Sequence, residues 1–424
     1  MVANHTYIDT LPFDGIMVKF PDYQDVLSQS CVANYAKLSN QLSPMKGLLQ
    51  KVTHNYASVL GGNTTPPDRF DDWTREINNW VILAEAVRDA GMEGIFYDNE
   101  EYNVHIWQYP ANCKYASTKT ASQYQQQWRL RGQQVAQAIL AQWPTFKMMH
   151  LIGPNRSVHN VPAGAMFQGD PNWMGGYFFM GMFAGAPGHI INGGELYYNR
   201  TVSQFANWLN FNQTTLTQPA QSPPLIPSLL FSTWQAQNNQ SFGIYDQDTV
   251  GSPAMTPSVL QQTITNALPY VNTFVWNYSE NLDWLTPGAG ASNNWIPAVW
   301  NARHAAGLPD PGATSTSPTP SPTQTPSSTP TQGTPVISNV QVSNITGSSA
   351  IISWNVAPAS TGQVEYGTST SYGHFTTLET NHLTFHRQSL SGLNAGTLYH
   401  FRIHDVSQSG ASVPLVDRTF STSQ

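Results

Sequence analysis

The sequence predicts an α/β domain of the (β/α)8 barrel class over residues 1–308, a linker over 309–335 and a small all-β sandwich over 336–424. In the first domain, short apolar segments alternate with helical segments, which is typical of a parallel sheet with crossover helices. The linker is rich in Pro, Ser and Thr and has almost no apolar side chains, so it is expected to act as a semi-stiff spacer. In the last segment, apolar residues alternate with polar ones, as in strands.

Seven segments of the first domain have the apolar character of buried strands. They are residues 13–20, 47–52, 95–97, 146–152, 189–198, 227–234 and 271–280. Helical spacing predicts helices at 26–42, 70–89, 120–142, 201–212 and 256–268. An eighth strand is expected near Tyr7-Ile8 or within 175–183. If it comes first, the 95–97 strand is the fourth, Glu195 ends the sixth and Glu280 ends the eighth.

Two other features of the first domain bear on its architecture. Residues 153–188 read as a long loop-rich region, which suggests a functional loop or a lid. A doubly wound open sheet is the alternative to a barrel, although neither GxGxxG nor a P-loop follows a strand in this sequence.

Composition narrows the range of partners. Charged residues make up 10% of the 424 residues, the formal net charge is -7, and no basic run occurs. Nucleic acid and anionic membranes are therefore not expected as main partners. Aromatic residues make up 12%, with 13 Trp and 18 Tyr, and their rings suit stacking on the apolar faces of sugars. The composition thus favours a carbohydrate ligand.

The cysteines and the linker bear on the cellular compartment. Cys31 and Cys113 lack CxxC spacing and are either one disulfide or two buried thiols. No stretch is long and apolar enough to span a bilayer. The start, Met1-Val-Ala-Asn-His5, is polar, but a Ser/Thr/Pro linker is typical of secreted multidomain enzymes. We expect a secreted protein whose export signal has been removed; a cytoplasmic protein is the alternative.

The segment Gly94-Ile-Phe-Tyr-Asp-Asn-Glu-Glu-Tyr102 is the strongest candidate for a site, because carboxylates follow a buried strand. Residues two apart on an extended chain point to the same side, so Asp98 and Glu100 are expected to act together. A neighbouring Asp raises the pKa of a Glu or holds its proton, which suits Glu100 as general acid/base. Glu101 is expected to point away into solvent. The alternative is a strand followed by an acidic helix cap.

Glycoside hydrolysis needs a second carboxyl group across the scissile bond. Glu195 follows Asn192-Gly-Gly194, and glycines let a ligand approach the backbone closely. Glu195 is favoured as nucleophile or base, and an ion pair with Arg200 is its alternative role. Glu280 lies among aromatic residues and is the other candidate for the second carboxylate or for binding hydroxyls, unless this segment is only structural.

The expected sugar contacts are aromatic residues near strand ends and two polar residues at the end of the 47–52 strand. They are Tyr102, Trp234, Trp276, Tyr278, Trp284, His54 and Asn55. The sequence contains no HExxH, no three-His cluster and no EF-hand loop, so neither a metal nor another cofactor is expected. It contains no G-x-S-x-G elbow, so serine-hydrolase chemistry is not expected.

The C-terminal segment resembles the fibronectin type III family. The run Leu393-Asn-Ala-Gly-Thr-Leu-Tyr-His-Phe-Arg-Ile403 matches the signature of that family, with Tyr399 in the place of the tyrosine-corner residue. Trp354 and Gln363-Val-Glu-Tyr-Gly367 also match. The resemblance implies a spacer or adhesion module, which would associate with a cell surface or a polysaccharide.

The first domain resembles the TIM-barrel glycoside hydrolases. The residues that carry the resemblance are Pro12-Phe-Asp-Gly15, Phe70-Asp-Asp-Trp73, Gly94–Tyr102, Gly193-Gly-Glu195 and Phe274-Val-Trp-Asn-Tyr-Ser-Glu280. The resemblance implies hydrolysis of O-glycosyl bonds at the carboxyl ends of the strands.

The leading hypothesis is therefore a secreted glycoside hydrolase that cleaves a polysaccharide or oligosaccharide with two carboxyl groups. A non-catalytic carbohydrate-binding or adhesion protein on a barrel scaffold is the main alternative, because it needs the aromatic residues but not a facing pair of carboxylates. A polysaccharide lyase ranks third, because the chain has few Lys and Arg (18 together) to neutralise a uronate.

Overall fold

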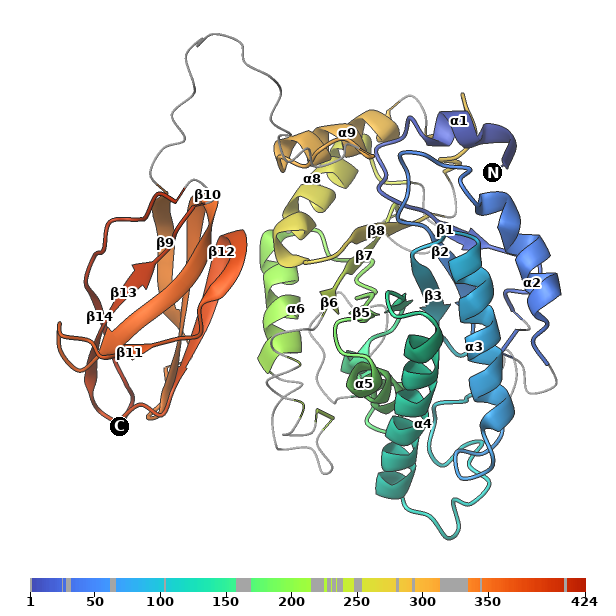
Figure 1. The fold of residues 1–424 in the computed structure, drawn as a ribbon, viewed down its shortest axis with the longest axis horizontal. Helices are drawn as coiled ribbons and strands as arrows, with labels where there is room; N and C mark the ends of the chain where they lie inside the picture. The colour runs from blue at the N-terminus through green and yellow to red at the C-terminus, as the bar shows by residue number, and fades with distance from the viewer. Residues whose placement is uncertain are drawn as a thin grey trace. The chain divides into compact units, whose positions relative to one another are not determined.

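The structure is a computed structural model (Figure 1). It describes residues 2–424 except 25, 28–31, 62–65, 103, 158–168, 215–224, 227–229, 231–233, 235–238, 248–253, 280–281, 292–293, 313–334, 344 and 408–409. The chain divides into two compact units, Met1–Ser317 and Pro318–Gln424. Most of the linker predicted at 309–335 lies outside the described residues.

Parallel strands form the centre of the first unit. In the larger sheet they follow one another in sequence order, and all pairs are parallel. The strands are β1 (Met17–Lys19), β2 (Tyr56–Leu60), β3 (Gly94–Asp98), β4 (Lys147–His150), β5 (Ile190–Asn192) and β6 (Asn239–Gln240). A doubly wound sheet would reverse its strand order part-way, and the described strands show no such reversal.

A two-stranded parallel sheet, β7 (Phe242–Tyr245) and β8 (Val275–Tyr278), continues from the first. Ser241 alone separates β6 from β7, and the backbone hydrogen bonds to the β5 segment run on across it. The amide of Ser241 donates to Asn192 (2.9 Å) and that of Gly243 donates to Gly194 (2.8 Å). Residues 239–245 therefore act as one strand between the β5 segment and β8.

Helices surround these strands (Figure 1). They are η1 (Val2–Asn4), α1 (His5–Ile8), α2 (Tyr35–Leu42), η2 (Ser43–Met45), α3 (Thr74–Asp89), α4 (Ala121–Gln142), η3 (Pro154–Ser157), α5 (Gly175–Gly185), α6 (Val202–Thr214), α8 (Pro257–Ala267), η6 (Leu268–Tyr270) and α9 (Trp295–Ala305). Local sequence fixes where α4 begins, because Thr120 and Gln123 form a reciprocal capping box.

Some strand predictions are wrong. Residues 47–52 form a turn and irregular chain, because the carboxylate of Asp9 accepts hydrogen bonds from the amides of Gln50, Lys51 and Val52 and removes them from any ladder. Neither proposed location holds an eighth strand, since Tyr7 and Ile8 lie in α1 and 175–183 lies in α5. Most of 227–234 lies outside the described residues, and the described strand segment nearest to it is 239–245.

The region 153–188, expected to be loop-rich, contains the buried helix α5. Its side chains are apolar on every face, which is the pattern of a core helix. Glycines permit its close packing on α4: a Cβ atom at Gly181 would lie 2.1 Å from the carbonyl oxygen of Arg129, and one at Gly132 would lie 2.2 Å from that of Phe178.

Side chains from distant strands meet in the core. The rings of Phe96 on β3 and Trp276 on β8 lie 5.6 Å apart, although β4, β5, β6 and β7 separate these strands in sheet order. Near the amino-terminal end of β1, the guanidinium of Arg303 on α9 donates two hydrogen bonds to Asp14 (2.6 and 3.0 Å). The first and last parts of the unit are thus joined directly.

The second unit is an all-β sandwich. Its strands are β9 (Val336–Ser343), β10 (Ser349–Gly367), β11 (His374–Phe375), β12 (Glu379–Ser391), β13 (Leu398–His404) and β14 (Arg418–Ser421), and all their pairings are antiparallel. The core includes Trp354 and Tyr399. The Tyr399 hydroxyl accepts a hydrogen bond from the amide of Asn394 (2.9 Å), which is the corner contact predicted from the sequence.

Candidate active site

The carboxyl ends of parallel strands lie at the same edge of a sheet, so the residues that follow β3, β5, β7 and β8 are brought together. Asp98 is the last residue of β3. Glu195 follows β5 by three residues and forms a parallel bridge with Gly243 of β7. The strand ends therefore gather the side chains that the sequence singled out.

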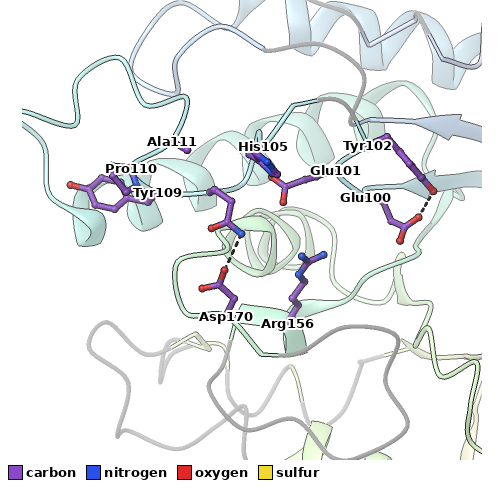
Figure 2. A pocket seen from close by; sticks show the side chains of 10 residues that line it. Glu100, Glu101, Tyr102, His105, Tyr109, Pro110, Ala111, Arg156 and Asp170 are labelled. Atoms are coloured by element: carbon purple, nitrogen blue, oxygen red, sulfur yellow. Dashed lines mark hydrogen bonds between the residues drawn. The ribbon is translucent and has the colours of Figure 1, made fainter.

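Asp98 and Glu100 are paired as the alternation argument predicts. The amide of Glu100 donates to Oδ1 of Asp98 (3.2 Å). The hydroxyl of Tyr102 reaches both side chains. It lies 3.2 Å from Oδ2 of Asp98. It also contacts Oε2 of Glu100, as Figure 2 shows. Burial, and next the nearby charge of Glu100, raise the pKa of Asp98 to about 7.

Glu195 lies close enough to Asp98 and Glu100 for their charges to act on it. Its residue is 3% exposed, and Oε2 has no hydrogen-bond partner among the described residues. Burial is the main cause that raises its pKa well above the usual range, and the charges of Glu100 and Asp98 raise it further. A hydrogen bond with Tyr197 and the charge of Arg156 act in the opposite direction. We call Asp98, Glu100 and Glu195 the carboxyl cluster.

A cavity of about 450 Å³ lies beside Glu100. Its lining combines charged and polar groups with apolar surface, and comes from the chain after β3, from η3 and from the segment before α5 (Figure 2). The lining residues are Glu100, Glu101, Tyr102, His105, Gln108, Tyr109, Pro110, Ala111, Arg156 and Asp170. The expectation that Glu101 points away into solvent is wrong, because it lines this cavity and accepts a hydrogen bond from the amide of Trp107 (2.8 Å).

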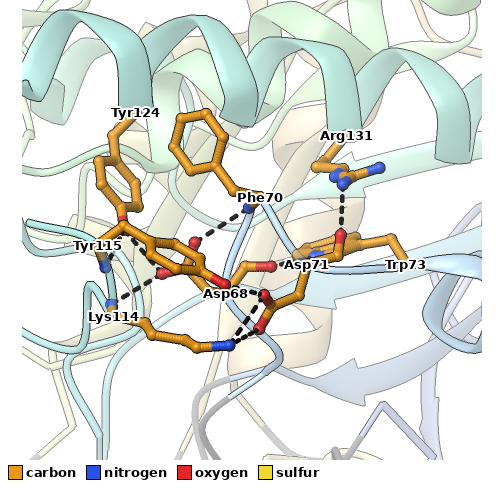
Figure 3. A network of polar contacts seen from close by, with 8 residues as sticks. All are labelled: Asp68, Phe70, Asp71, Trp73, Lys114, Tyr115, Tyr124 and Arg131. Carbon is orange, nitrogen blue, oxygen red and sulfur yellow. Dashed lines mark hydrogen bonds and ion pairs between the residues drawn. The ribbon is translucent and has the colours of Figure 1, made fainter. Parts of the chain in front are cut away.

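Two sets of contacts hold the loop that carries these residues. Asn99 is buried and bridges to Ile152 beyond β4, with its amide group donating to the carbonyl and its oxygen accepting from the amide (both 2.8 Å). Farther along the loop, Asp68 accepts hydrogen bonds from the amide of Lys114 (2.9 Å) and the hydroxyl of Tyr124 (2.8 Å) (Figure 3). The loop is therefore fixed at both ends.

Aromatic side chains form one wall near Glu195. The ring of Tyr197 stacks on that of Tyr278 at 5.7 Å and 11°, and packs against Tyr245 at 5.3 Å. The edge of Trp276 completes the wall, and its ring nitrogen donates to the carbonyl of Gly193 (2.7 Å). Tyr278 is 39% exposed, so a ring from this wall is open to a ligand.

Other predicted contacts lie elsewhere. Trp234 is 1% exposed and packs on Phe179 and Phe183 of α5, which makes it a core residue. His54 and Asn55 precede β2 rather than end a strand, so they lie at the opposite edge of the sheet, where His54 pairs with Glu93 (2.5 Å). The assignment of Trp234 is wrong because its side chain is buried, and those of His54 and Asn55 are wrong because a strand begins after them instead of ending before them.

The remaining two predictions have different outcomes. The side chain of Trp284 is buried, packs against Phe13 and donates to Asp246 (3.3 Å), which leaves little surface for a sugar. Glu280, the other candidate for the second carboxylate, lies outside the described residues.

Sequence reasoning missed several residues at this end of the sheet, besides the cavity-lining residues His105, Gln108 and Asp170. Tyr197 stands two residues after Glu195, in a turn that follows the β5 segment. Asp246, buried directly after β7, was hidden because the 239–245 strand was not predicted. Arg156 lies in the short helix η3 and carries no sequence signal.

The described residues include no group of three His, Cys, Asp or Glu side chains that could hold a metal ion. Cys113 is a free thiol, and Cys31 lies outside the described residues. None of the described helices is both long and apolar enough to cross a membrane.

Comparison with known proteins bears on the second unit. Residues 334–418 match the model of the fibronectin type III domain. The second unit is a fibronectin type III domain. No curated protein is similar enough to the chain to match it.

Solved structures similar to part of the chain include a computationally redesigned β-sandwich protein, at 26% identity over 20% of this chain and 93% of that one (TM-score 0.18). The sensor domain of an anti-sigma factor from Pseudobacteroides cellulosolvens is 19% identical over 22% and 96% (TM-score 0.18). A human fibronectin type III domain is 16% identical over 20% and 72% (TM-score 0.17).

Proposed function

We propose that the first unit is a (β/α)8-type barrel that hydrolyses glycosidic bonds of a polysaccharide or oligosaccharide, in a secreted protein whose fibronectin type III domain associates with polysaccharide or a cell surface. The observation that carries the proposal is the carboxyl cluster. Two of its members have raised pKa values, and a buried oxygen of Glu195 has no hydrogen-bond partner among the described residues. Buried polar atoms are normally paired, and an incoming sugar oxygen would supply the partner.

Three observations support the barrel. The parallel strands run in sequence order. Right-handed crossovers then place all the helices on one face of the sheet. The other face can be buried only if the sheet curls round so that its strands face one another. The ring contact between Phe96 and Trp276 is a contact across such an interior. The Arg303–Asp14 ion pair ties the last helix to the first strand, as closure requires.

Hydrolysis needs one carboxyl group that is protonated and one that is ionised. The raised pKa of Glu195 favours a proton there at neutral pH, so we assign Glu195 as the general acid and Glu100 as the nucleophile or base. This reverses the roles expected from the sequence. Asp98 and Tyr102 hold Glu100 in place through their hydrogen bonds.

The aromatic wall and the cavity supply binding surface. The exposed ring of Tyr278 suits stacking on a sugar face, and Tyr102 is 55% exposed beside Glu100. The cavity, with Glu101, Arg156 and Asp170 among its lining residues, suits a sugar unit that binds through hydroxyl groups.

One observation favours the alternative of a non-catalytic carbohydrate-binding protein. Glu195 is almost fully buried, and a carboxyl group that serves only to shape the site would also be buried. A binding protein would keep its affinity for sugar when Glu195 becomes Gln and would release no product.

The test is to incubate the protein with a panel of polysaccharides and to measure the reducing ends that are released. We expect wild-type protein to cleave at least one polymer, and Glu195→Gln and Glu100→Gln each to lower kcat by at least about 100-fold. Glu85→Gln, on α3 and outside the cluster, serves as the matched control and should retain full activity. Normal turnover by Glu195→Gln and Glu100→Gln would refute the proposal.

A further inference from the structure

The hydroxyl group of Tyr102 lies between two carboxyl groups. It is 3.2 Å from Oδ2 of Asp98. It also contacts Oε2 of Glu100, as Figure 2 shows. The backbone amide of Glu100 donates to the other oxygen of Asp98 (3.2 Å), which ties the two acidic residues together. The three side chains therefore form a chain of contacts in which the phenol is the middle member.

The number of protons on the two carboxyl groups decides whether both contacts can be hydrogen bonds. A phenol has one proton to donate, and an ionised carboxylate only accepts. If Asp98 and Glu100 were both ionised, the phenol would donate to one of them and turn its own lone pairs toward the other. If one of them is protonated, it donates to the phenol oxygen while the phenol donates to its partner. Both contacts are therefore satisfied only when the pair holds a proton.

The surroundings favour Asp98 as the protonated member at neutral pH. Burial, and next the charge of Glu100, raise the pKa of Asp98 to about 7. A proton on Asp98 leaves the phenol free to donate to the carboxylate of Glu100, and hydrogen bonds to an ionised acceptor are the stronger kind. This arrangement also leaves one negative charge on the pair instead of two, beside the buried carboxyl group of Glu195.

Other ionisable groups act on the pair or respond to its charge. They are Lys19 on β1, Tyr97 on β3, Tyr102 in the following loop, and Glu195 and Tyr197 after β5. Lys19 is the cation of this set and favours the ionised form of Asp98, but its effect ranks below those of burial and of Glu100. The balance therefore still favours a proton on Asp98.

We propose that Tyr102 is a positioning residue through which Asp98 and Glu100 share one proton, so that Glu100 is ionised for its part in the reaction. The O–H of Asp98 donates to the phenol oxygen, and the phenol O–H donates to Glu100. If the phenol proton moves to Glu100 and the Asp98 proton moves to the phenol oxygen, the negative charge passes to Asp98 and no proton is gained or lost. This inference rests on the proposed function and adds to it which carboxyl group carries the charge.

The first test is the pH profile of Tyr102→Phe, which keeps the ring and removes the hydroxyl. Tyr102 is 55% exposed, so the fold should tolerate the change. Without the phenol donor, the first ionisation of the pair requires a higher pH. We expect the acid limb of kcat/KM to move up by about one pH unit. A limb that stays in place, with kcat/KM lowered alike at every pH, would overturn the proposal.

The matched control is Tyr115→Phe. Tyr115 lies in the same loop, and its hydroxyl donates to a carboxylate outside the carboxyl cluster, that of Asp71 (2.7 Å). The pH profile of this variant should coincide with that of wild type. A shift equal to that of Tyr102→Phe would also overturn the proposal, because the effect would then not depend on the link between Asp98 and Glu100.

A second measurement does not depend on activity. Carbon-13 NMR of the full chain with labelled aspartate and glutamate carboxyl carbons follows Asp98 and Glu100, which are identified as the resonances missing in Asp98→Asn and Glu100→Gln. We expect both resonances to move in the same step near pH 7 in wild type, because the proton that leaves is shared. In Tyr102→Phe the step should be confined to Asp98.

The outcomes separate the shared proton from the proposed function. A wild-type step seen at Asp98 alone would refute the sharing, and a step that stays common to both residues in Tyr102→Phe would refute the role of the phenol. The expected NMR result without hydrolysis in any assay would uphold the shared proton and refute the proposed function.

Discussion

At the scale of single residues, Asp98 shows how the site differs from an ordinary surface. Its pKa is raised to about 7, first by burial and then by Glu100. A carboxyl group with a raised pKa binds its proton more tightly in the folded than in the unfolded state. Between about pH 4 and pH 7, folding therefore takes up a proton at Asp98, and the free energy of unfolding falls as pH rises through this window.

Asp98→Asn should remove that dependence. Near pH 2 the variant and wild type should be about equally stable, because Asp98 is uncharged in both folded and unfolded chains there. By about pH 8 the variant should be more stable by about 2 kcal/mol, roughly half of what the full shift would give, since Asp98 keeps some exposure. Urea unfolding across this pH range measures the difference. Two stability curves that run parallel would contradict the raised pKa.

The residue scale also shows what a sequence can predict of a site. Asp98, Glu100 and Glu195 could be found because each follows a short apolar run, and parallel strands bring such ends together. Tyr197 and Asp246 required the register of β5 and the existence of β7. Trp234, His54 and Asn55 were misplaced because aromatic or polar character alone does not tell which end of a strand a residue occupies.

At the scale of elements, the loop after β3 depends on Asn99. Asn99→Ala should leave both the amide and the carbonyl of Ile152 without their buried partner, and unpaired buried groups are costly. We expect a loss of about 2 to 4 kcal/mol in the free energy of unfolding and a loss of activity, because Glu100 follows directly.

The matched control for Asn99→Ala is Asn301→Ala, on α9. Asn301 is exposed, and its side chain makes one long hydrogen bond to Gln261 (3.4 Å). Denaturant unfolding should show a change below about 0.5 kcal/mol. If the two variants were equally stable, the bridge from Asn99 to Ile152 would not hold the loop.

Long helices and most of the short apolar strands could be predicted, but two kinds of element could not. The helix α4 matches its expected range to within one residue, and α3 ends at Asp89 as expected but begins at Thr74 rather than at residue 70, because apolar spacing and the Thr120 cap act locally. The strand expected at 47–52 does not form, because the carboxylate of Asp9, distant in sequence, accepts the hydrogen bonds of its amides. The helix α5 was missed because its all-apolar sequence lacks the two-faced pattern that marks a surface helix.

At the scale of the whole molecule, the ion pair between Asp14 and Arg303 joins the beginning and the end of the first unit. The Arg303 side chain is 8% exposed, so removing its partner leaves a largely buried charge without its carboxylate. Asp14→Ala should lower the free energy of unfolding of the first unit by about 1 to 3 kcal/mol.

A nearby pair provides the control for Asp14→Ala. Asp310 pairs with His304 of the same helix, but both side chains are more than half exposed. Asp310→Ala should therefore change stability by less than about 0.5 kcal/mol in thermal or urea unfolding. Equal effects of the two substitutions would mean that Asp14 does not contribute to closing the unit.

The two units differ in how far their sequences identify them. The fibronectin type III domain has a signature centred on Tyr399, and both its fold and its family follow from that segment. The first unit has no single diagnostic segment. Its strands are parallel and in sequence order, and the chemistry that we propose for it rests on side chains that meet only after folding.

The central claim is that the carboxyl cluster adds water across a glycosidic bond. The most direct test is mass spectrometry of the products formed from a cleaved polysaccharide in water labelled with oxygen-18. We predict one labelled oxygen at the new reducing end for each bond cleaved by wild-type protein, and no product from Glu195→Gln. Unlabelled, unsaturated products would contradict hydrolysis and point to elimination, and wild-type protein that binds sugar but releases no product from any polymer would contradict catalysis altogether.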